Sequence, residues 1–459
     1  MTRNLILIIV SFCLLILMPP DKVYAQQDDS FLDIQEVVSK GGIKAWLVED
    51  HNIPVLAMEF IFRGQGAITD LPEKQGLARM VSNTLDEGAG DIKSREFQKE
   101  LQDLSLTLRF NVSRDHFGGS FKTLSRNRAR GFELLKLALT QPRFDKEPVD
   151  RMRDANKSRL RSSINDPRWI GARIQNDRIF EDHPYAQNSG GTLSSLDRIT
   201  PAELKAFHKK LTKSDLVISV AGDITAEELS IALDEIFGSL PESTDEKNKA
   251  TNKITLQNSK KTYLFERDIP QTHIEIAQNG IGRSDDNYHA AQVMNFILGG
   301  GGFGSRLMDE IREKRGLTYG IYTYFREYNE SDVYHLTTST QNSSVKELLD
   351  LVKAEWIKIK NEPVSQKELS DARSYLLGSL PLSLTSTDSI AGLLLTLQID
   401  KLPIDYLDKR QETIRGITTN DIQRVAERIL DSNSFTTILV GKPENVENAE
   451  IITLLPNVE

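Results

Sequence analysis

The chain has 459 residues, of which 39% are hydrophobic and 27% charged, with a formal net charge of −9 and one cysteine. That apolar fraction is enough for sizeable cores, so a wholly disordered or fibrous protein is excluded. The 57 Lys and Arg residues do not outnumber the 66 Asp and Glu residues, which argues against nucleic acid as a partner. At roughly 150 residues per domain, the length alone suggests about three domains.

The first 25 residues have the pattern of a secretory signal peptide. Arg3 supplies a positive start, residues 5–18 are apolar, and Val23-Tyr24-Ala25 is a small-x-small-like cleavage site. The apolar stretch is short for a membrane span, although an uncleaved anchor is the alternative. Cleavage after residue 25 would remove Cys13, so we expect neither disulfides nor thiol chemistry. The sequence predicts an exported protein, periplasmic or extracellular, with no membrane segment after cleavage.

Strand and helix patterns alternate along the chain that follows. Residues 45–48 predict a strand, and residues 106–112 alternate between apolar and polar as on a half-buried strand. A polar turn at 113–116 separates that strand from a second one over 117–121. Further on, apolar residues recur at helical spacing over 345–356, which predicts a helix that ends before the next proline.

A weak internal repeat relates the two halves of the chain. Ile-Pro pairs begin at positions 53 and 269, Ile-Thr pairs begin at 199 and 417, and strand-like apolar runs end at Gly222 and Gly441. The offsets are 269 − 53 = 216, 417 − 199 = 218 and 441 − 222 = 219. Such a constant offset indicates a duplicated unit.

The repeat replaces the estimate of three domains with a prediction of two homologous lobes, residues 26–241 and residues 262–459. Hairpins interspersed with long helices predict the α+β class, each lobe being a largely antiparallel sheet covered by helices. Residues 242–261 are polar and charged, as expected of an exposed linker.

Residues 76–88 predict a helix with an apolar face formed by Leu77, Met80, Val81 and Leu85. Its opening, Gly-Leu-Ala-Arg-Met-Val-Ser-Asn, resembles the zinc-binding helix of the pitrilysin/insulinase-like metallopeptidases, whose motif is H-x-x-E-H. In that motif the two histidines ligate zinc and the glutamate serves as general base. Here Arg79 and Asn83 stand at the histidine positions, and Ser82 stands at the position of the base.

The resemblance also implies a third zinc ligand, a glutamate further along the chain. Two separate spacings, one counted from Asn83 and one counted back from Pro167, both place it at Arg159. No catalytic residue and no zinc are therefore expected on this chain, because two guanidiniums repel a divalent cation. If Arg79 and Arg159 approach each other as the ligands would, we expect a carboxylate partner or an open, hydrated pocket, since unpaired buried charge is costly.

A second segment, residues 299–319, resembles the glycine-rich segment of the same family's C-terminal lobe, as in the mitochondrial-processing-peptidase branch. After the glycines we expect a helix that Ser305 caps, that buries Leu307 and Ile311, and that Gly316 ends. A phosphate site is disfavoured because no Gly-Lys-Ser/Thr follows the glycines.

The resemblance assigns substrate binding to this segment. It implies roles for the glycine run and for the family's Arg/Tyr pair: Gly299, Gly300, Gly301, Gly302, Arg312 and Tyr319. In the family, the pair reaches across a closed chamber to the zinc site of the other half, where it holds the substrate backbone and the tyrosine hydroxyl supports the developing oxyanion. The alternative is a solvated helix arginine and a packed tyrosine.

The histidines give no metal-ligand spacing. His183 lies in a His-Pro-Tyr loop that is common in the family, and a structural role is expected of it. The remaining histidines are expected to be surface or hydrogen-bonded residues: His51, His116, His208, His273, His289 and His335.

The resemblance covers the whole mature chain and implies a non-catalytic, substrate-binding subunit of a heterodimeric zinc metallopeptidase. Zinc is expected in a homologous partner subunit, and the substrate is expected to be a peptide. Two alternatives stay open: a peptide-binding or scaffold pseudoenzyme with no proteolytic partner, similar to respiratory-complex core subunits, and a self-sufficient metallopeptidase with an unrecognised zinc site that includes His183 or another histidine.

Overall fold

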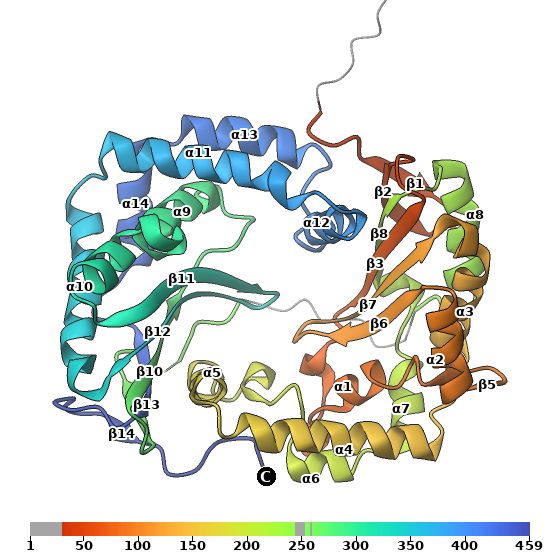
Figure 1. The fold of residues 1–459 in the computed structure, drawn as a ribbon, viewed down its shortest axis with the longest axis horizontal. Coiled ribbons are helices and arrows are strands. Elements are labelled where there is room, and N and C mark those ends of the chain that lie inside the picture. The colour runs from red at the N-terminus through yellow and green to blue at the C-terminus, as the bar shows by residue number, and fades with distance from the viewer. Residues whose placement is uncertain (1–29, 244–252, 258) are drawn as a thin grey trace, which may run out of the picture.

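The computed structural model describes residues 30–243, 253–257 and 259–459, so the predicted signal peptide and part of the predicted linker lie outside the described residues. The described chain forms two lobes, one coloured red to green and the other green to blue in Figure 1. Each lobe has one six-stranded sheet covered by helices, which confirms the predicted α+β class.

Both sheets are largely antiparallel. The strands of the first sheet lie in the order β1 (Gln35–Val38), β2 (Lys44–Glu49), β8 (Leu216–Gly222), β3 (Val55–Arg63), β7 (His116–Leu124) and β6 (Thr107–Val112). Those of the second lie in the order β14 (Glu450–Ile451), β9 (Thr262–Glu266), β13 (Thr436–Gly441), β10 (Gln271–Asn279), β12 (Ser331–Gln341) and β11 (Thr318–Tyr328). A short hairpin of β4 (Gly88–Ala89) and β5 (Ile92–Lys93) stands apart.

The two sheets repeat one topology. In each, five strands follow the same spatial order, and among these five the one parallel pair, β2 with β8 or β9 with β13, lies at the same place. Only the sixth strand differs, because β1 precedes β2 in the chain and pairs antiparallel with it, whereas β14 comes last and pairs parallel with β9. The predicted strand at 45–48 lies within β2, and the predicted hairpin is β6 and β7.

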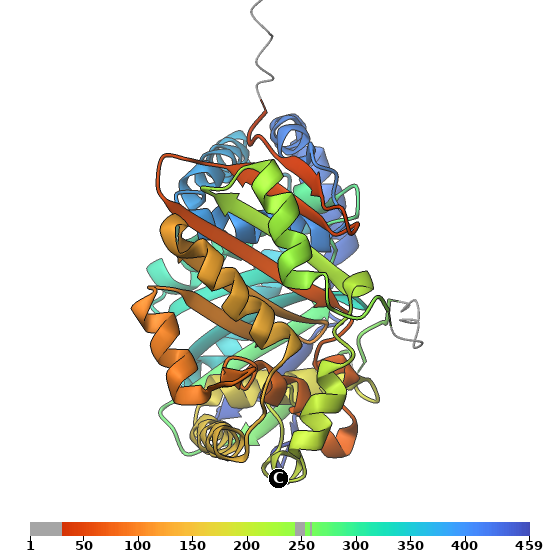
Figure 2. The same ribbon diagram turned by 90° about the vertical axis from the view of Figure 1, so that its right-hand side faces the viewer.

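The outer face of each sheet carries most of the core. The helices of the first half are α1 (Leu77–Ser82), α2 (Ser94–Asp103), α3 (Arg128–Thr140), α4 (Lys146–Ser163), α5 (Pro167–Ile179), α6 (Leu193–Asp197), α7 (Pro201–His208) and α8 (Ala226–Phe237). Those of the second half are α9 (Tyr288–Asn295), α10 (Val345–Asn361), α11 (Gln366–Ser383), α12 (Thr387–Ile399), α13 (Tyr406–Gly416) and α14 (Thr419–Ile429). Figure 2 shows α8, α3 and α2 lying over the outer face of the first sheet.

The two lobes exchange one helix each. Helix α5 belongs to the first half of the chain but packs on the second sheet, where Ile170 and Ile174 meet apolar residues of β9 and β13. Helix α12 belongs to the second half but packs on the first sheet, through Ala391 and Leu394 (Figure 1). Both helices have 13 residues, and their starts are offset by 387 − 167 = 220, so the exchange belongs to the internal repeat. Each sheet therefore has its own helices on one face and the other lobe's helix on the opposite face.

No single helix in the described part of the chain is long and apolar enough to cross a membrane. Helices α11 and α12 pass that test only as a pair, and they are bent by 120° at their junction. In this fold α12 is the core helix that covers the first sheet.

Candidate functional site

The degenerate zinc motif lies on α1, at the edge of the first lobe. Gly76 precedes the helix with φ +88°, and a Cβ there would lie 2.7 Å from the Cα of Gly191, so only glycine fits. The Asp70 carboxylate accepts hydrogen bonds from the backbone N–H groups of Gly76 (2.9 Å) and Ala78 (3.0 Å), and so caps the helix start. The start of the helix that carries the motif is thus well formed.

The helix is shorter than the sequence predicts, because it ends at Ser82 rather than at residue 88. From Asn83 the chain turns towards β4, and the Thr84 hydroxyl donates to the carbonyl of Met80 (2.7 Å) in place of a further helical turn. The apolar face persists through this turn, since Leu85 is fully buried like Met80.

The four altered positions do come together. Asn83 Nδ2 donates to Oδ1 of Asn156 on α4 (2.9 Å), and Ser82 Oγ donates to the carbonyl of Arg79 (2.9 Å). Arg79 donates to the carbonyl of Val112 (3.0 Å), at the end of edge strand β6. Burial, and next the charge of Arg159, lower the pKa of Arg79.

Arg79 and Arg159 line one cavity of about 280 Å³, together with Asn156 and Asn188. Arg159 is exposed, and within the described residues the structure records no salt bridge for either guanidinium. Of the two alternatives expected from the sequence, the open pocket therefore fits the geometry and the carboxylate salt bridge does not. The Arg79 guanidinium donates to a backbone carbonyl, and Arg159 stays in solvent.

The donor set does not fit zinc. Two guanidiniums, an amide and a hydroxyl replace the two imidazoles, the carboxylate ligand and the carboxylate base. Across residues 30–243, 253–257 and 259–459, no group of three or more His, Cys, Asp or Glu side chains is placed to hold a metal ion.

The glycine-rich segment differs in detail from the expected single capped helix. A π-helical turn covers Phe296–Gly300, a 3₁₀ turn covers Gly302–Gly304, and a second π-helical turn covers Met308–Glu313. Ser305 does not cap a helix, because its hydroxyl donates to the carbonyl of Gly302 (2.8 Å) and so fixes the glycine turn. Gly302 has φ +60°, which explains a glycine at that position.

The rest of the segment follows the prediction. Leu307 and Ile311 are fully buried, and Gly316, with φ +64°, ends the turn by donating its N–H to the carbonyl of Arg312 (2.9 Å). Here π-helical turns occupy what the 3.6-residue pattern predicts as an α-helix, and π-bulges occur often at functional sites.

Arg312 and Tyr319 are presented at the surface. The Arg312 guanidinium carbon lies 4.4 Å from the ring centroid of Phe303, and its Nη1 lies 2.9 Å from Glu313 Oε1. Tyr319 is 91% exposed and Phe303 is 70% exposed. The packed-tyrosine alternative is wrong, because almost the whole Tyr319 side chain is exposed.

A cavity of about 390 Å³ adjoins Tyr319. It lies between the first turn of α5 and strands β10, β11 and β12, and Arg168, His273, Tyr322 and Ser339 also line it. The sequence analysis missed this group, because its members come from four separate segments. One signal was present: His273 and Glu275 are two residues apart on a strand, and such residues share a face.

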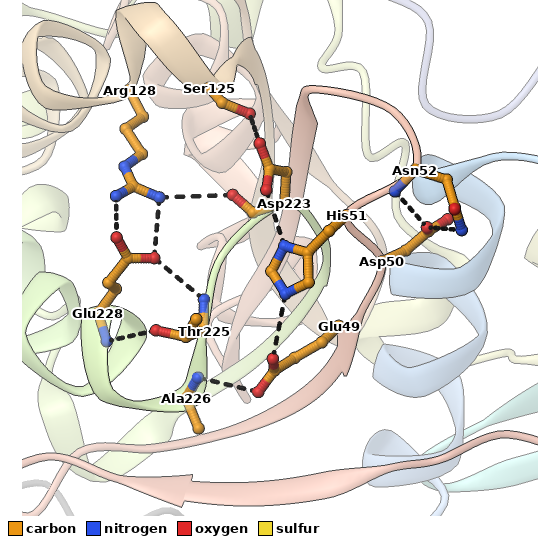
Figure 3. A network of polar contacts seen from close by, with 10 residues as sticks. All are labelled: Glu49, Asp50, His51, Asn52, Ser125, Arg128, Asp223, Thr225, Ala226 and Glu228. Carbon is orange, nitrogen blue, oxygen red and sulfur yellow. Dashed lines mark hydrogen bonds and ion pairs between the residues drawn. The ribbon is translucent and has the colours of Figure 1, made fainter.

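The histidines are mostly bonded, as expected. His183 Nδ1 accepts the N–H of Tyr185 (3.2 Å), and its Nε2 lies 2.6 Å from Glu330 Oε2 of the second lobe, so this loop joins the lobes. His51 lies in the surface network of Figure 3, 2.8 Å from Asp223 Oδ1 and 3.3 Å from Glu49 Oε2. The hydrogen bond to Asp223, followed by that to Glu49, raises the pKa of His51.

His335 corrects the expectation that every histidine is exposed or hydrogen-bonded. It is 2% exposed, and neither ring nitrogen has a hydrogen-bond partner among the described residues. Its ring stacks on Tyr324 with the centroids 5.0 Å apart. Burial, followed by the charges of Arg326 and Arg114, lowers the pKa of His335 to about 3.

Comparison with known proteins agrees with this geometry. The family model described as the peptidase M16 inactive domain matches residues 198–376. A Helicobacter pylori protein named "Non-peptidase homolog YmxG" is 26% identical over 404 residues, which cover 86% of this chain and 90% of that protein. The β subunit of the mitochondrial processing peptidase of Saccharomyces cerevisiae is 21% identical over 85% of this chain and 88% of its own length.

The crystal structure of a peptidase M16 inactive domain from Pseudomonas fluorescens has the same fold. Its TM-score is 0.82 at 27% identity, and the match covers 91% of this chain and 100% of that one. Fold, relatives and altered ligand positions agree: the chain is similar to the inactive, non-peptidase members of the peptidase M16 family.

Proposed function

We propose that this chain is the non-catalytic, substrate-binding subunit of a heterodimeric zinc metallopeptidase that processes or degrades peptides. The observation that carries the proposal is the contrast between two surfaces of one chain. The positions of the zinc ligands and of the base hold Arg79, Asn83, Arg159 and Ser82, while the segment that holds substrate in the family keeps an exposed Tyr319.

The contacts of Arg312 support this role. Stacking on Phe303 restricts the guanidinium, so less side-chain entropy is lost when it binds a peptide carbonyl. Tyr319 has only solvent around most of its surface, so its hydroxyl is free to enter the catalytic centre of another chain. A hydrogen-bond donor placed at a developing oxyanion contributes to the rate even when the metal and base belong to the partner.

The partner would be a homologous subunit with an intact H-x-x-E-H motif, and zinc would be bound there. The similarity to a protein named as one subunit of the mitochondrial processing peptidase supports a two-chain assembly. The signal-peptide pattern of residues 1–25 supports export, so the complex would act in the periplasm or outside the cell.

The test is reconstitution. The chain is mixed with a zinc-bearing homologue from the same genome, and cleavage of a fluorogenic peptide mixture is measured for the wild type, for Arg312→Ala, and for Tyr319→Phe. We expect each variant to lower kcat/KM of the mixture by about 100-fold or more, as loss of one oxyanion donor does.

Arg315→Ala is the matched control, because Arg315 lies in the same segment but pairs with Glu310 (2.6 Å). It should leave kcat/KM unchanged. Equal activity of wild type, Arg312→Ala and Tyr319→Phe in an active mixture would refute the assigned role. Peptide binding by the chain without gain of cleavage from any zinc-bearing homologue would instead support the scaffold or peptide-binding pseudoenzyme.

A further inference from the structure

A serine, a histidine and a glutamate meet on the inner face of the second sheet, far in sequence from the degenerate zinc motif. His273 and Glu275 lie on β10, and the antiparallel register places them directly opposite Ser339 and Thr337 of β12. Residues two apart on a strand share a face, so all four side chains project towards α5.

The hydrogen bonds join these side chains in a chain of three groups. Ser339 Oγ lies 3.1 Å from His273 Nδ1, and His273 Nε2 lies 2.8 Å from Glu275 Oε1. Because a carboxylate only accepts, the proton of the imidazole belongs on Nε2. Nδ1 is then the acceptor, and it faces the serine hydroxyl.

The histidine and the glutamate are held firmly. They are 4% and 7% exposed, and the Thr337 hydroxyl donates a second hydrogen bond to Glu275 Oε1 (2.9 Å). Helix α5 approaches them at Gly171, where a Cβ would lie 3.0 Å from the His273 ring and 3.2 Å from Glu275 Cγ. A glycine at this position lets the helix cover the pair and exclude water from it.

The serine end opens to a cavity. Ser339 is half-buried and lines the pocket of about 390 Å³ beside Tyr319, and Arg168 of α5 lines the same pocket. A nucleophile, a base within hydrogen-bond reach, an oriented carboxylate behind the base, and a cation in the same cavity are the parts of a serine-type acyl-transfer site.

We propose that Ser339, His273 and Glu275 form a serine-type acyl-transfer site that accepts small carboxylic esters. Ser339 Oγ attacks the ester carbonyl carbon while its proton passes to His273 Nδ1. The bond from that carbon to the alkoxy oxygen then breaks, and the proton on Nδ1 goes to the departing alcohol. Water repeats the sequence on the acyl-serine, which releases the carboxylic acid and restores the serine hydroxyl.

The neighbouring groups set the substrate class. Glu275 stabilises the imidazolium formed in each step, and the Arg168 guanidinium provides positive charge in the cavity for the tetrahedral oxyanion. The cavity is near the lower limit of small-molecule sites, so short acyl groups fit and a folded polypeptide does not. This site needs neither zinc nor a partner subunit, so its test does not depend on the proposed function.

The experiment uses the purified full chain alone. It is treated with a fluorophosphonate probe, the modified peptide is located by mass spectrometry, and hydrolysis of p-nitrophenyl acetate is followed in parallel. We expect the label on Ser339, and we expect Ser339→Ala and His273→Gln each to lower the esterase rate by about 100-fold. Ser343→Ala, at an exposed serine of the next turn, is the matched control and should change neither readout.

The label on the wild-type protein gives a result that does not depend on how a variant folds. Glu275→Gln should keep labelling but slow it, because the neutral amide no longer stabilises the imidazolium. An unlabelled Ser339 in protein that carries label elsewhere, or an esterase rate unchanged by Ser339→Ala, would overturn the proposal and leave a structural polar cluster under α5.

Discussion

His335 gives the sharpest prediction of stability. Its ring is buried beside Tyr324, has no hydrogen-bond partner among the described residues, and faces the positive charges of Arg326 and Arg114. The substitution His335→Phe keeps a flat ring of similar size at this place. It removes two buried nitrogens that lack partners, and a ring that acid would protonate in the unfolded chain.

The magnitude follows from linkage. The pKa of His335 is about 3 in the folded protein against 6.5 as its ordinary value, so between these values only the unfolded state binds the proton. The free energy of unfolding is therefore unaffected above pH 6.5 and falls as the pH drops below it. At pH 5 the loss is about 2 kcal/mol, from 1.5 pH units at about 1.4 kcal/mol each.

Urea unfolding at pH 5 and pH 8 measures this loss. Trp356 reports on the transition, because it is buried in the core on the opposite face of the same sheet. His335→Phe should gain about 2 kcal/mol more over wild type at pH 5 than at pH 8. His51→Gln should change with the opposite sign, because the raised pKa of His51 gives stability that is present below pH 6.5 and lost as the pH rises through its folded pKa. A His335→Phe effect that is equal at both pH values would refute the neutral, buried histidine.

Three further predictions test the fold and the lost metal site. The combined change Arg79→His, Ser82→Glu, Asn83→His and Arg159→Glu should bind one zinc ion per chain by elemental analysis, and the same variant with Arg159 kept should bind it more weakly. Leu394→Ala, in the helix exchanged between lobes, should lower the free energy of unfolding by about 2–5 kcal/mol, whereas Leu382→Ala, 77% exposed, should change it by less than about 0.5 kcal/mol. Gly222→Ala should lower the thermal midpoint, because its Cβ would lie 2.1 Å from the Val55 carbonyl oxygen at φ +117°, whereas Gly378→Ala meets no atom within 4 Å and should raise it.

Sequence periodicity predicted the strands and helices that bury one face. The alternation at 106–112 gave β6, and the helical spacing at 345–356 gave α10, because both patterns follow from burial on one side. The constant offset between halves predicted the common topology of the sheets. The exchange of α5 and α12 was not predictable, because an amphipathic helix does not specify which of two similar sheets it covers.

The same limit explains the candidate sites. The local sequence pattern correctly predicted a helix at residues 79–82. It did not predict that the helix ends at Ser82, because that end depends on the turn around Thr84. The pairing of His273 with Ser339 needs the register of two strands that are 66 residues apart, and no local pattern gives that register. The burial of His335 was not predicted, because it lies on the sheet face opposite to Tyr334 and Leu336, and the sequence does not show that this face is also covered. Its lack of partners depends on Tyr324 and the two arginines.

The loss of the zinc ligands left the fold intact for a physical reason. On α1 the core side is formed by Met80 and Val81, whereas Arg79 faces the cavity that Arg159 also lines, and Asn83 is bonded to Asn156, another residue of that cavity. Arg79 donates to the Val112 carbonyl and Arg159 is exposed, so neither side chain belongs to the apolar core of the lobe. The core residues and the residues at the ligand positions therefore lie on different faces of one short helix, so this helix packs in the same way with or without metal ligands.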